Sequence, residues 1–310
     1  MNDKEPEQIK SIKQLPREEV LFPGTPACAG CGGILTLRYC MKALGTKVVI
    51  VNAAGCFTLL PIYPYNPFQS SWLYTAMACA PAAAQGVRDA LDTLLETGRL
   101  KPEEDLKVVV LTGDGAAYDI GLASTSGAIY RNLDFYYICY DNEAYGNTGF
   151  QWSGATPFAS STGTTPFGVG ARKPKKDLFA IWNSHKPPYL ATISPSHPVD
   201  LFNKLKKAEQ YSGPKLFIAL SPCPPGWGIE PCRAIKLAKL AVDTGVWPLK
   251  EAVYGEVTHT IVPPKLKPVE EYLKEQGRFA HLFKPVRQEE TLKRVQEIVD
   301  EYWKRHQLLL

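Results

Sequence analysis

Short apolar runs rich in β-branched and aromatic residues recur along the chain and alternate with longer stretches of helical character. The runs cover residues 47–52, 107–112, 134–140, 189–194 and 215–221. Runs of this length and composition are typical of buried strands. The stretches 75–98 and 198–211 are long enough for the crossover helices that parallel strands require. The pattern therefore predicts an α/β fold with a doubly wound, mostly parallel sheet.

The two ends of the chain differ from this alternating middle part. Residues 1–23 are polar and charged and predict an N-terminal arm, whereas 24–235 contain the alternating elements of one α/β domain. Residues 236–310 predict a C-terminal extension that ends in a helix, because apolar residues of its last segment share one helical face. That face is formed by Leu292, Val295, Ile298, Val299 and Trp303.

The composition suits a globular protein and disfavours membrane and nucleic-acid functions. With 45% hydrophobic and 21% charged residues the chain can bury a full core. It has neither an apolar run of about 18 residues nor the apolar core of a signal peptide near its start. We therefore expect a cytoplasmic protein that does not span a membrane. A net charge of +4 is too mild to indicate nucleic-acid binding, although it could help to dock an acidic protein.

Polar residues follow two of the predicted strands directly. Asp114 lies in the segment GDGAAYDIG and Asn142, 28 positions later, in YDNEAYGNTG. Ligands of doubly wound sheets bind beyond the carboxyl ends of the strands, so we expect both side chains at one edge. Carboxylate, amide and carbonyl oxygens suit Mg²⁺ that also holds phosphate oxygens. Gly113 and Gly115 would let the backbone approach a phosphate, and a helix beginning near residue 116 would present its N-terminus to it.

The pairing of GDG with a later asparagine resembles the thiamine-diphosphate motif of enzymes that use this cofactor. By that resemblance, Asp114 and Asn142 bind Mg²⁺ through their side chains and Ala144 binds it through its carbonyl. The alternative is that GDG is only a turn and DN only a cap at a strand end. A dinucleotide site is disfavoured, because Tyr118 stands where G-x-G-x-x-G needs its third glycine.

Eight cysteines in a chain without an export signal predict metal ligation or burial rather than disulfides. Cys28 and Cys31 form a C-x-x-C in a Gly/Pro loop, and Cys56 and Cys223 each follow a predicted strand. A C-x-x-C with two isolated cysteines favours an iron–sulfur cluster, with zinc as the alternative. We expect the other thiols to be small buried side chains, with Cys232 as a substitute ligand if Cys223 is not one. These other thiols are Cys40, Cys79, Cys139 and Cys232.

Five segments occur in the same order as in the beta subunits of pyruvate:ferredoxin oxidoreductases and related 2-oxoacid enzymes. They are PACAGCG, NAAGC, GDGAAYDIG, YDNEAYGNTG and SPCPPGW, and the chain resembles this family over about residues 20–235. The resemblance implies thiamine diphosphate with Mg²⁺, and one 4Fe-4S cluster held by Cys28, Cys31, Cys56 and Cys223, with Cys56 also beside the cofactor. It further implies that Asn147, as a catalytic residue, and Thr148 lie by the cofactor and the substrate.

The implied reaction is the oxidative decarboxylation of a small 2-oxoacid, with electrons passed through the cluster to ferredoxin. Thiamine catalysis also needs a glutamate on the pyrimidine ring, which a separate pyrimidine-binding domain supplies in this cofactor class. The sequence contains neither a second α/β pattern nor a C-x-x-C-x-x-C run. We therefore expect a hetero-oligomer whose other subunits supply the pyrimidine-binding domain, its catalytic glutamate and additional 4Fe-4S clusters.

Departures from the family pattern leave the substrate open between pyruvate and oxalate. Family members commonly read T-G-G-Q at residues 148–151, where this chain has Phe150, and we expect this ring either to pack in the core or to reshape the pocket. Binding of oxalate would need positively charged side chains, which the tract 171–176 could supply. A run of basic residues is, however, more often part of a solvent-exposed surface. Two other functions remain: a non-redox thiamine-diphosphate decarboxylase subunit with structural zinc, and a non-catalytic assembly subunit.

Overall fold

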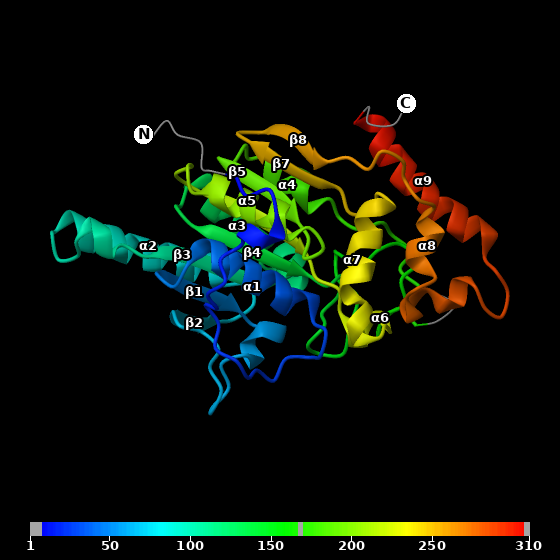
Figure 1. The fold of residues 1–310 in the computed structure, drawn as a ribbon, viewed down its shortest axis with the longest axis horizontal. Coiled ribbons are helices and arrows are strands. Elements are labelled where there is room, and N and C mark those ends of the chain that lie inside the picture. The colour runs from blue at the N-terminus through cyan, green and yellow to red at the C-terminus, as the bar shows by residue number, and fades with distance from the viewer. Residues whose placement is uncertain (1–7, 167–169, 307–310) are drawn as a thin grey trace.

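The computed structural model describes residues 8–166 and 170–306 and is built around one eight-stranded sheet (Figure 1). The strand order is β2-β1-β3-β4-β6-β5-β7-β8. All strands from β2 at one edge to β5 in this order run parallel to one another. Strand β7 pairs antiparallel with β5, and β8 pairs antiparallel with β7. The strands are β1 (Val48–Ala53), β2 (Ser71–Thr75), β3 (Lys107–Gly113), β4 (Tyr136–Asp141), β5 (Tyr189–Ile193), β6 (Lys215–Leu220), β7 (Leu249–Val253) and β8 (Glu256–Ile261).

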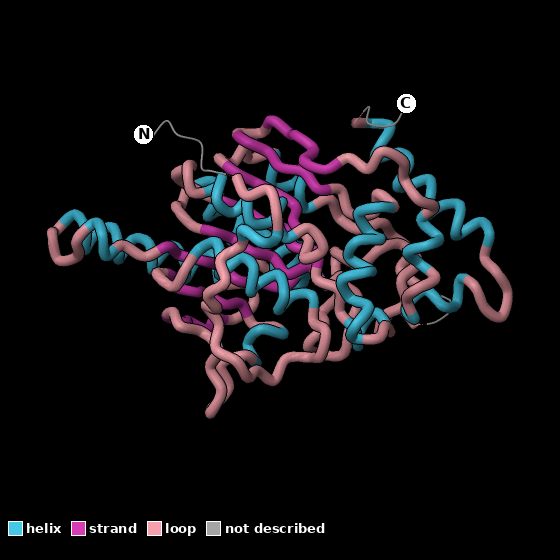
Figure 2. The backbone as a smooth tube through the Cα atoms, viewed as in Figure 1, coloured by secondary structure: helices cyan, strands magenta, loops and turns pink. Residues whose placement is uncertain are grey.

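Helices cover both faces of the sheet, as the tube in Figure 2 shows. The helices are α1 (Gly32–Leu44), α2 (Ala80–Glu96), α3 (Leu122–Tyr130), α4 (Leu178–Asn183), α5 (Pro198–Ala208), α6 (Pro224–Trp227), α7 (Ala234–Asp243), α8 (Val269–Leu273) and α9 (Glu289–Arg305). Short helical turns are η1 (Ile12–Gln14), η2 (Cys56–Leu59), η3 (Pro102–Glu104), η4 (Gly115–Ile120), η5 (Pro231–Arg233) and η6 (Gly277–Leu282). Within the described ranges, no helix is both long and apolar enough to cross a membrane.

The central strands are apolar throughout because both of their faces are buried. Val109 and Leu111 of β3 pack in the layer with α1 and α5, whereas Val108 and Val110 pack in the layer with α2, α3, α4 and α7. All six residues of β4 are buried. A mostly parallel sheet with helices on both faces confirms the predicted fold class.

The C-terminal segment adds to the same sheet. Its strands β7 and β8 form an antiparallel hairpin on β5, and α9 packs its predicted apolar face inward. Within that face Trp303 is 1% exposed and donates its Nε1–H to Gly245 O at 2.9 Å. The N-terminal arm also contacts the body, since Ile9 exchanges two backbone hydrogen bonds with the Asn203 side chain of α5. A domain boundary near residue 235 stays a prediction.

The thiols outside the predicted cluster ligands divide into two kinds. Cys40 of α1 and Cys139 of β4 are fully buried, as expected for small apolar side chains. Cys79 and Cys232 are exposed, so the expectation of burial is wrong for them. Cys79 stands at the N-cap of α2 and Cys232 in the short turn η5, where the chain does not face the core.

Four neighbouring strands carry the predicted site residues at their carboxyl ends. Strands β1, β3, β4 and β6 lie side by side in the sheet. Cys56, Asp114, Asn142 and Cys223 follow them within three residues of each strand end. The order of the strands therefore brings segments that are far apart in the sequence to one edge.

Candidate functional site

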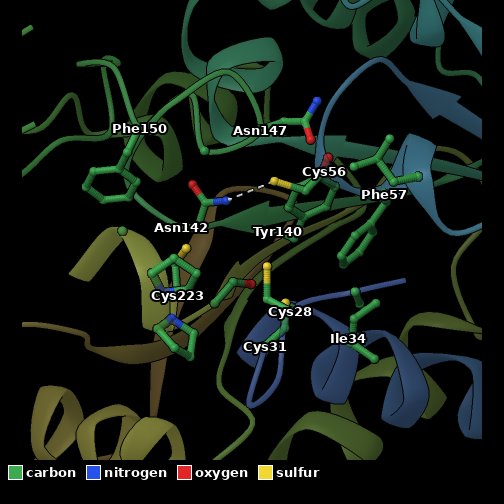
Figure 3. A pocket seen from close by; sticks show the side chains of 18 of the residues that line it. Cys28, Cys31, Ile34, Cys56, Phe57, Tyr140, Asn142, Asn147, Phe150 and Cys223 are labelled. Carbon is green, nitrogen blue, oxygen red and sulfur yellow. Dashed lines mark hydrogen bonds between the residues drawn. The ribbon is translucent and has the colours of Figure 1, made fainter. Parts of the chain in front are cut away.

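A pocket of about 400 Å³ opens at this edge, and we call it the thiol pocket (Figure 3). Its walls include the four predicted cluster ligands Cys28, Cys31, Cys56 and Cys223. Asn142 lies between Cys56 and Cys223 in the close view, and its Nδ2 donates to Cys56 Sγ at 3.9 Å. The remaining walls are mainly apolar and include Ile34, Phe57, Leu59, Leu60, Tyr140 and Phe150.

The C-x-x-C loop reaches Cys223 through a close backbone contact. Cys31 is the N-cap of α1, and the next residue, Gly32, donates its N–H to Pro222 O at 3.0 Å. A Cβ at position 32 would lie 2.5 Å from Pro222 Cδ, which is closer than atoms can approach. Glycine at position 32 therefore lets the two cysteine-bearing segments meet.

The thiols lie near enough to affect one another's ionisation. Burial raises the pKa of Cys56 to about 12, and the neighbouring Cys223, Cys31 and Cys28 add to this effect. Burial likewise raises the pKa of Cys223 to about 11. A hydrogen bond from the Gly226 backbone N–H stabilises the thiolate and so partly opposes this rise in pKa. Among the described residues, no three Cys, His, Asp or Glu side chains are close enough to form a ready site for a single metal ion. The thiols thus surround a space without converging on one point.

Next to the thiol pocket, three oxygen atoms face one another at the ends of β3 and β4. Asn142 Oδ1 lies 3.1 Å from Asp114 Oδ1 and 2.8 Å from Ala144 O, which are both acceptors, and it accepts a longer hydrogen bond from Ala144 N–H at 3.3 Å. Separations of about 2.9 Å are those of adjacent ligands in an octahedron with Mg–O distances of about 2.1 Å. The opposite orientation of the amide would satisfy the same atoms without a cation, since its NH₂ would then donate to both.

Asp114 is fully buried and has one strong hydrogen-bond donor. Burial raises its pKa well above the usual value, and the charge of Asp141 adds to this. Ser153 donates its Oγ–H to Asp114 Oδ2 at 2.5 Å, which leaves Oδ1 directed at Asn142. A carboxyl group in this position needs a cation or a proton to compensate for its burial.

The backbone around Asp114 is tight. A Cβ on Gly115 would lie 2.2 Å from Tyr145 Cε1, and a Cβ on Gly113 would lie 3.1 Å from Tyr140 Cε2. The chain enters the helical turn η4 at Gly115, one residue before the predicted start. Glycine at both positions therefore lets the backbone pack directly against these aromatic rings.

The two residues predicted beside the cofactor differ in position. Asn147 lines the thiol pocket, whereas Thr148 does not. The Thr148 hydroxyl is instead occupied in the local turn, where it donates to Gln151 Oε1 at 2.5 Å.

Phe150 combines the two roles that we considered for it. It is partly buried against the core and also lines the thiol pocket. Its φ of 61° is in the left-handed region that favours glycine, which fits the glycine that family members commonly carry there. Its ring lies on Gly226, where a Cβ would come within 2.1 Å of the ring.

A buried charge network behind Asn142 was not predicted. Lys175 Nζ pairs with Asp141 Oδ2 at 2.6 Å and with Glu143 Oε1 at 3.3 Å. Arg278 Nη2 pairs with Glu143 Oε2 at 2.7 Å and its guanidinium lies 4.0 Å from the centre of the Trp227 ring. The tract 171–176 is therefore only partly a solvated face.

This network fixes the segment that carries Asn142 and Ala144. Trp227 donates its Nε1–H to Asn142 O at 2.9 Å, and Glu143 has a φ of 68°. The sequence signals for the network were the two acidic residues flanking Asn142 and the basic tract 171–176, and no local pattern paired them because they are far apart in the chain.

Comparison with known proteins decides the family. Residues 53–219, more than half of the chain, match the family model "Thiamine pyrophosphate enzyme, C-terminal TPP binding domain". The chain is 41% identical to pyruvate synthase subunit PorB of Methanocaldococcus jannaschii, over 94% of this chain and 97% of that protein. The chain belongs to the beta subunits of the 2-oxoacid:ferredoxin oxidoreductases. It is also 39% identical to ketoisovalerate oxidoreductase subunit VorB of Pyrococcus furiosus, over 97% of this chain and 96% of that protein.

A solved structure supports the fold of this beta subunit. The 2-oxoglutarate:ferredoxin oxidoreductase from Magnetococcus marinus aligns with a TM-score of 0.55 and 23% identity, over 74% of this chain and 82% of that chain. The family that the motifs indicated is confirmed. The beta subunit is thus part of a thiamine-diphosphate-dependent oxidoreductase with further subunits.

Proposed function

We propose that this beta subunit holds thiamine diphosphate through Mg²⁺ and one 4Fe-4S cluster at adjoining sites, and oxidises a small aliphatic 2-oxoacid, pyruvate first among them. The observation that carries the proposal is the position of Asn142. One end of its side-chain amide faces Asp114 and Ala144, while the other end contacts Cys56 of the thiol pocket. One side chain thus joins the proposed metal site to the proposed cluster site.

The oxygen atoms near Asn142 support the Mg²⁺ assignment. Asp114, Asn142 and the carbonyl of Ala144 provide a carboxylate, an amide and a backbone oxygen, the hard ligands that Mg²⁺ prefers. Their separations of 2.8 and 3.1 Å suit adjacent octahedral positions. Gly113 and Gly115, beside Asp114, carry no Cβ that would hold a diphosphate away from the backbone.

The thiol pocket supports the cluster assignment. Cys28, Cys31, Cys56 and Cys223 line one space of about 400 Å³ rather than a compact tetrahedron. Four thiolates are the ligand set of a 4Fe-4S cluster, whereas zinc would need all sulfurs about 2.3 Å from one point. Backbone N–H groups directed at Cys31 and Cys223 would stabilise the sulfur charge.

The bound cofactor would cleave the bond next to the 2-oxo group and release electrons to the cluster. The chain's own residues bind, orient and exclude water around that reaction. Asp114, Asn142 and Ala144 would hold the Mg²⁺ that binds the diphosphate end, and the apolar side chains of Ile34, Phe57, Leu59 and Leu60 would limit water in the thiol pocket. We assign Asn147, which lines the same pocket, to the contact with the reacting part of the substrate.

The side chains that would surround the cluster and the adjoining substrate in the thiol pocket favour an aliphatic 2-oxoacid over oxalate. Its described walls contain no lysine or arginine. Lys175 and Lys176 of the basic tract are paired with Asp141 and Asp119 instead. A doubly charged substrate would therefore receive no compensating charge from the described walls of the thiol pocket. The named relatives act on pyruvate and ketoisovalerate, in line with this preference.

The rest of the proposed assembly follows from what this chain supplies. The other subunits provide the pyrimidine-binding domain with its glutamate and the further clusters, and ferredoxin receives the electrons. We place the assembly in the cytoplasm. A non-redox decarboxylase with structural zinc is the alternative that the assay below separates.

The test is a substrate assay on the anaerobically purified complex. Carbon dioxide release and viologen reduction are measured together with pyruvate, with 3-methyl-2-oxobutanoate and with oxalate. We expect both signals with pyruvate or the branched acid and neither with oxalate. Carbon dioxide without viologen reduction would identify the decarboxylase instead, and turnover of oxalate alone would overturn the substrate assignment.

A further inference from the structure

A second cavity, of about 260 Å³, lies under the C-terminal helix, and we call it the α9 cavity. It shares no lining residue with the thiol pocket. Its walls come from α4, β6, the segment before β7, α8 and α9. The apolar side chains in these walls include Phe179, Trp247, Val295, Ile298 and Val299.

One lysine in this wall is buried without an anionic partner. Lys250 of β7 is 6% exposed, and its Nζ lies 4.1 Å from the centre of the Phe179 ring and 4.8 Å from that of Tyr302. Among residues 8–166 and 170–306, no carboxylate oxygen lies within 4.0 Å of Nζ. The nearest acidic influence is Asp177, whose carboxylate caps α4 by accepting Ala180 N–H.

The other lysines of the α9 cavity are already paired with carboxylates. Lys175 is bound to Asp141 and Glu143, and Glu143 also pairs with Arg278. Lys176 pairs with Asp119. Lys250 is therefore the lysine of this cavity that remains available to an anion.

A buried ammonium without a counter-ion is unfavourable, and contacts with aromatic rings offset only part of the cost. An apolar cavity with one such cation suits a molecule with an apolar body and a single negative charge. We propose that the α9 cavity is a binding site for small apolar monocarboxylates, with the carboxylate on Lys250 Nζ and the alkyl chain against α9. This proposal is independent of the proposed reaction, since it uses none of the residues of the thiol pocket.

The test is calorimetric titration of the purified complex with octanoate, and with octan-1-ol as an uncharged match. We expect octanoate to bind and octan-1-ol to bind at least roughly tenfold more weakly, because a neutral hydroxyl group cannot form an ion pair with the Lys250 ammonium. Lys250→Met removes the charge at nearly constant shape and should weaken octanoate binding by a similar factor. Lys236→Met, at an exposed lysine of α7, is the matched control and should leave binding unchanged.

A second variant tests the cavity itself. Ile298→Trp, at a partly buried position of α9, fills the cavity but keeps Lys250, and it should abolish octanoate binding. Unchanged thiamine diphosphate content reports that each variant has folded. Absence of octanoate binding to the parent complex, equal binding by Lys250→Met, or retained binding by Ile298→Trp would each overturn the proposal.

Discussion

Replacing the buried lysine of β7 should stabilise the protein. Burial lowers the pKa of Lys250 from 10.5 to about 8. A tenfold change in an ionisation constant corresponds to about 1.4 kcal/mol, so keeping Lys250 protonated below pH 8 costs the fold roughly 3 kcal/mol. Lys250→Met removes this cost but loses the contacts with two rings, worth about 0.5–2 kcal/mol. The expected net gain at pH 7 is about 1–2 kcal/mol.

The gain should depend on pH in a defined direction. Between pH 8 and 10.5 the unfolded parent binds a proton on Lys250 that the folded parent does not, so the parent gains stability as the pH rises. The advantage of Lys250→Met is therefore full below pH 8 and fades toward pH 10.5. No such fading is expected for Lys236→Met, whose lysine is exposed.

The assay is urea unfolding of the purified protein, followed by circular dichroism at pH 7 and at pH 9.5. Each variant is compared with the parent at both values. A loss of stability in Lys250→Met at pH 7, or a difference that is the same at both pH values, would refute the assignment of Lys250 as a buried, uncompensated cation.

Three further predictions concern the candidate site. Asp114→Ala should weaken the binding of thiamine diphosphate by on the order of 100-fold or more and leave the iron content unchanged. Equilibrium dialysis measures the first quantity and iron analysis the second. Unchanged binding of thiamine diphosphate would contradict the ligand assignment. Cys56→Ser should lose most of the bound iron, whereas Cys40→Ser, at a buried position of α1, should keep it, and the reverse result would reassign the ligands. Arg278→Met should lower the free energy of unfolding in urea by about 3–5 kcal/mol, because Glu143 loses a buried partner. An unchanged free energy of unfolding would show that Lys175 alone compensates the charge of Glu143.

The central part of the fold could be predicted from the sequence because its strands are buried on both faces. The apolar runs mark β1, β3, β4, β5 and β6 to within about two residues at each end. The strands that the pattern missed lie toward the edges. Strand β2 has mostly exposed or partly exposed side chains, and β8 is largely exposed as well. With one face or both in water, such strands carry no continuous apolar run.

The candidate site could be predicted where its residues follow the strands directly or belong to the C-x-x-C motif. Asp114, Asn142, Cys56 and Cys223 have this local signal, and the strand order then places them together. The partners of the Asn142 segment have no such signal. Arg278 meets Glu143 through tertiary packing alone, and a cationic residue in a polar stretch reads as a surface group until the fold is known.

The central claim is that the four thiols of the thiol pocket hold an iron–sulfur cluster beside the thiamine-diphosphate site. Iron, zinc and acid-labile sulfide should be measured together in the anaerobically purified beta subunit. We predict about four iron and four sulfide per chain, with no stoichiometric zinc. About one zinc per chain without sulfide would contradict the account.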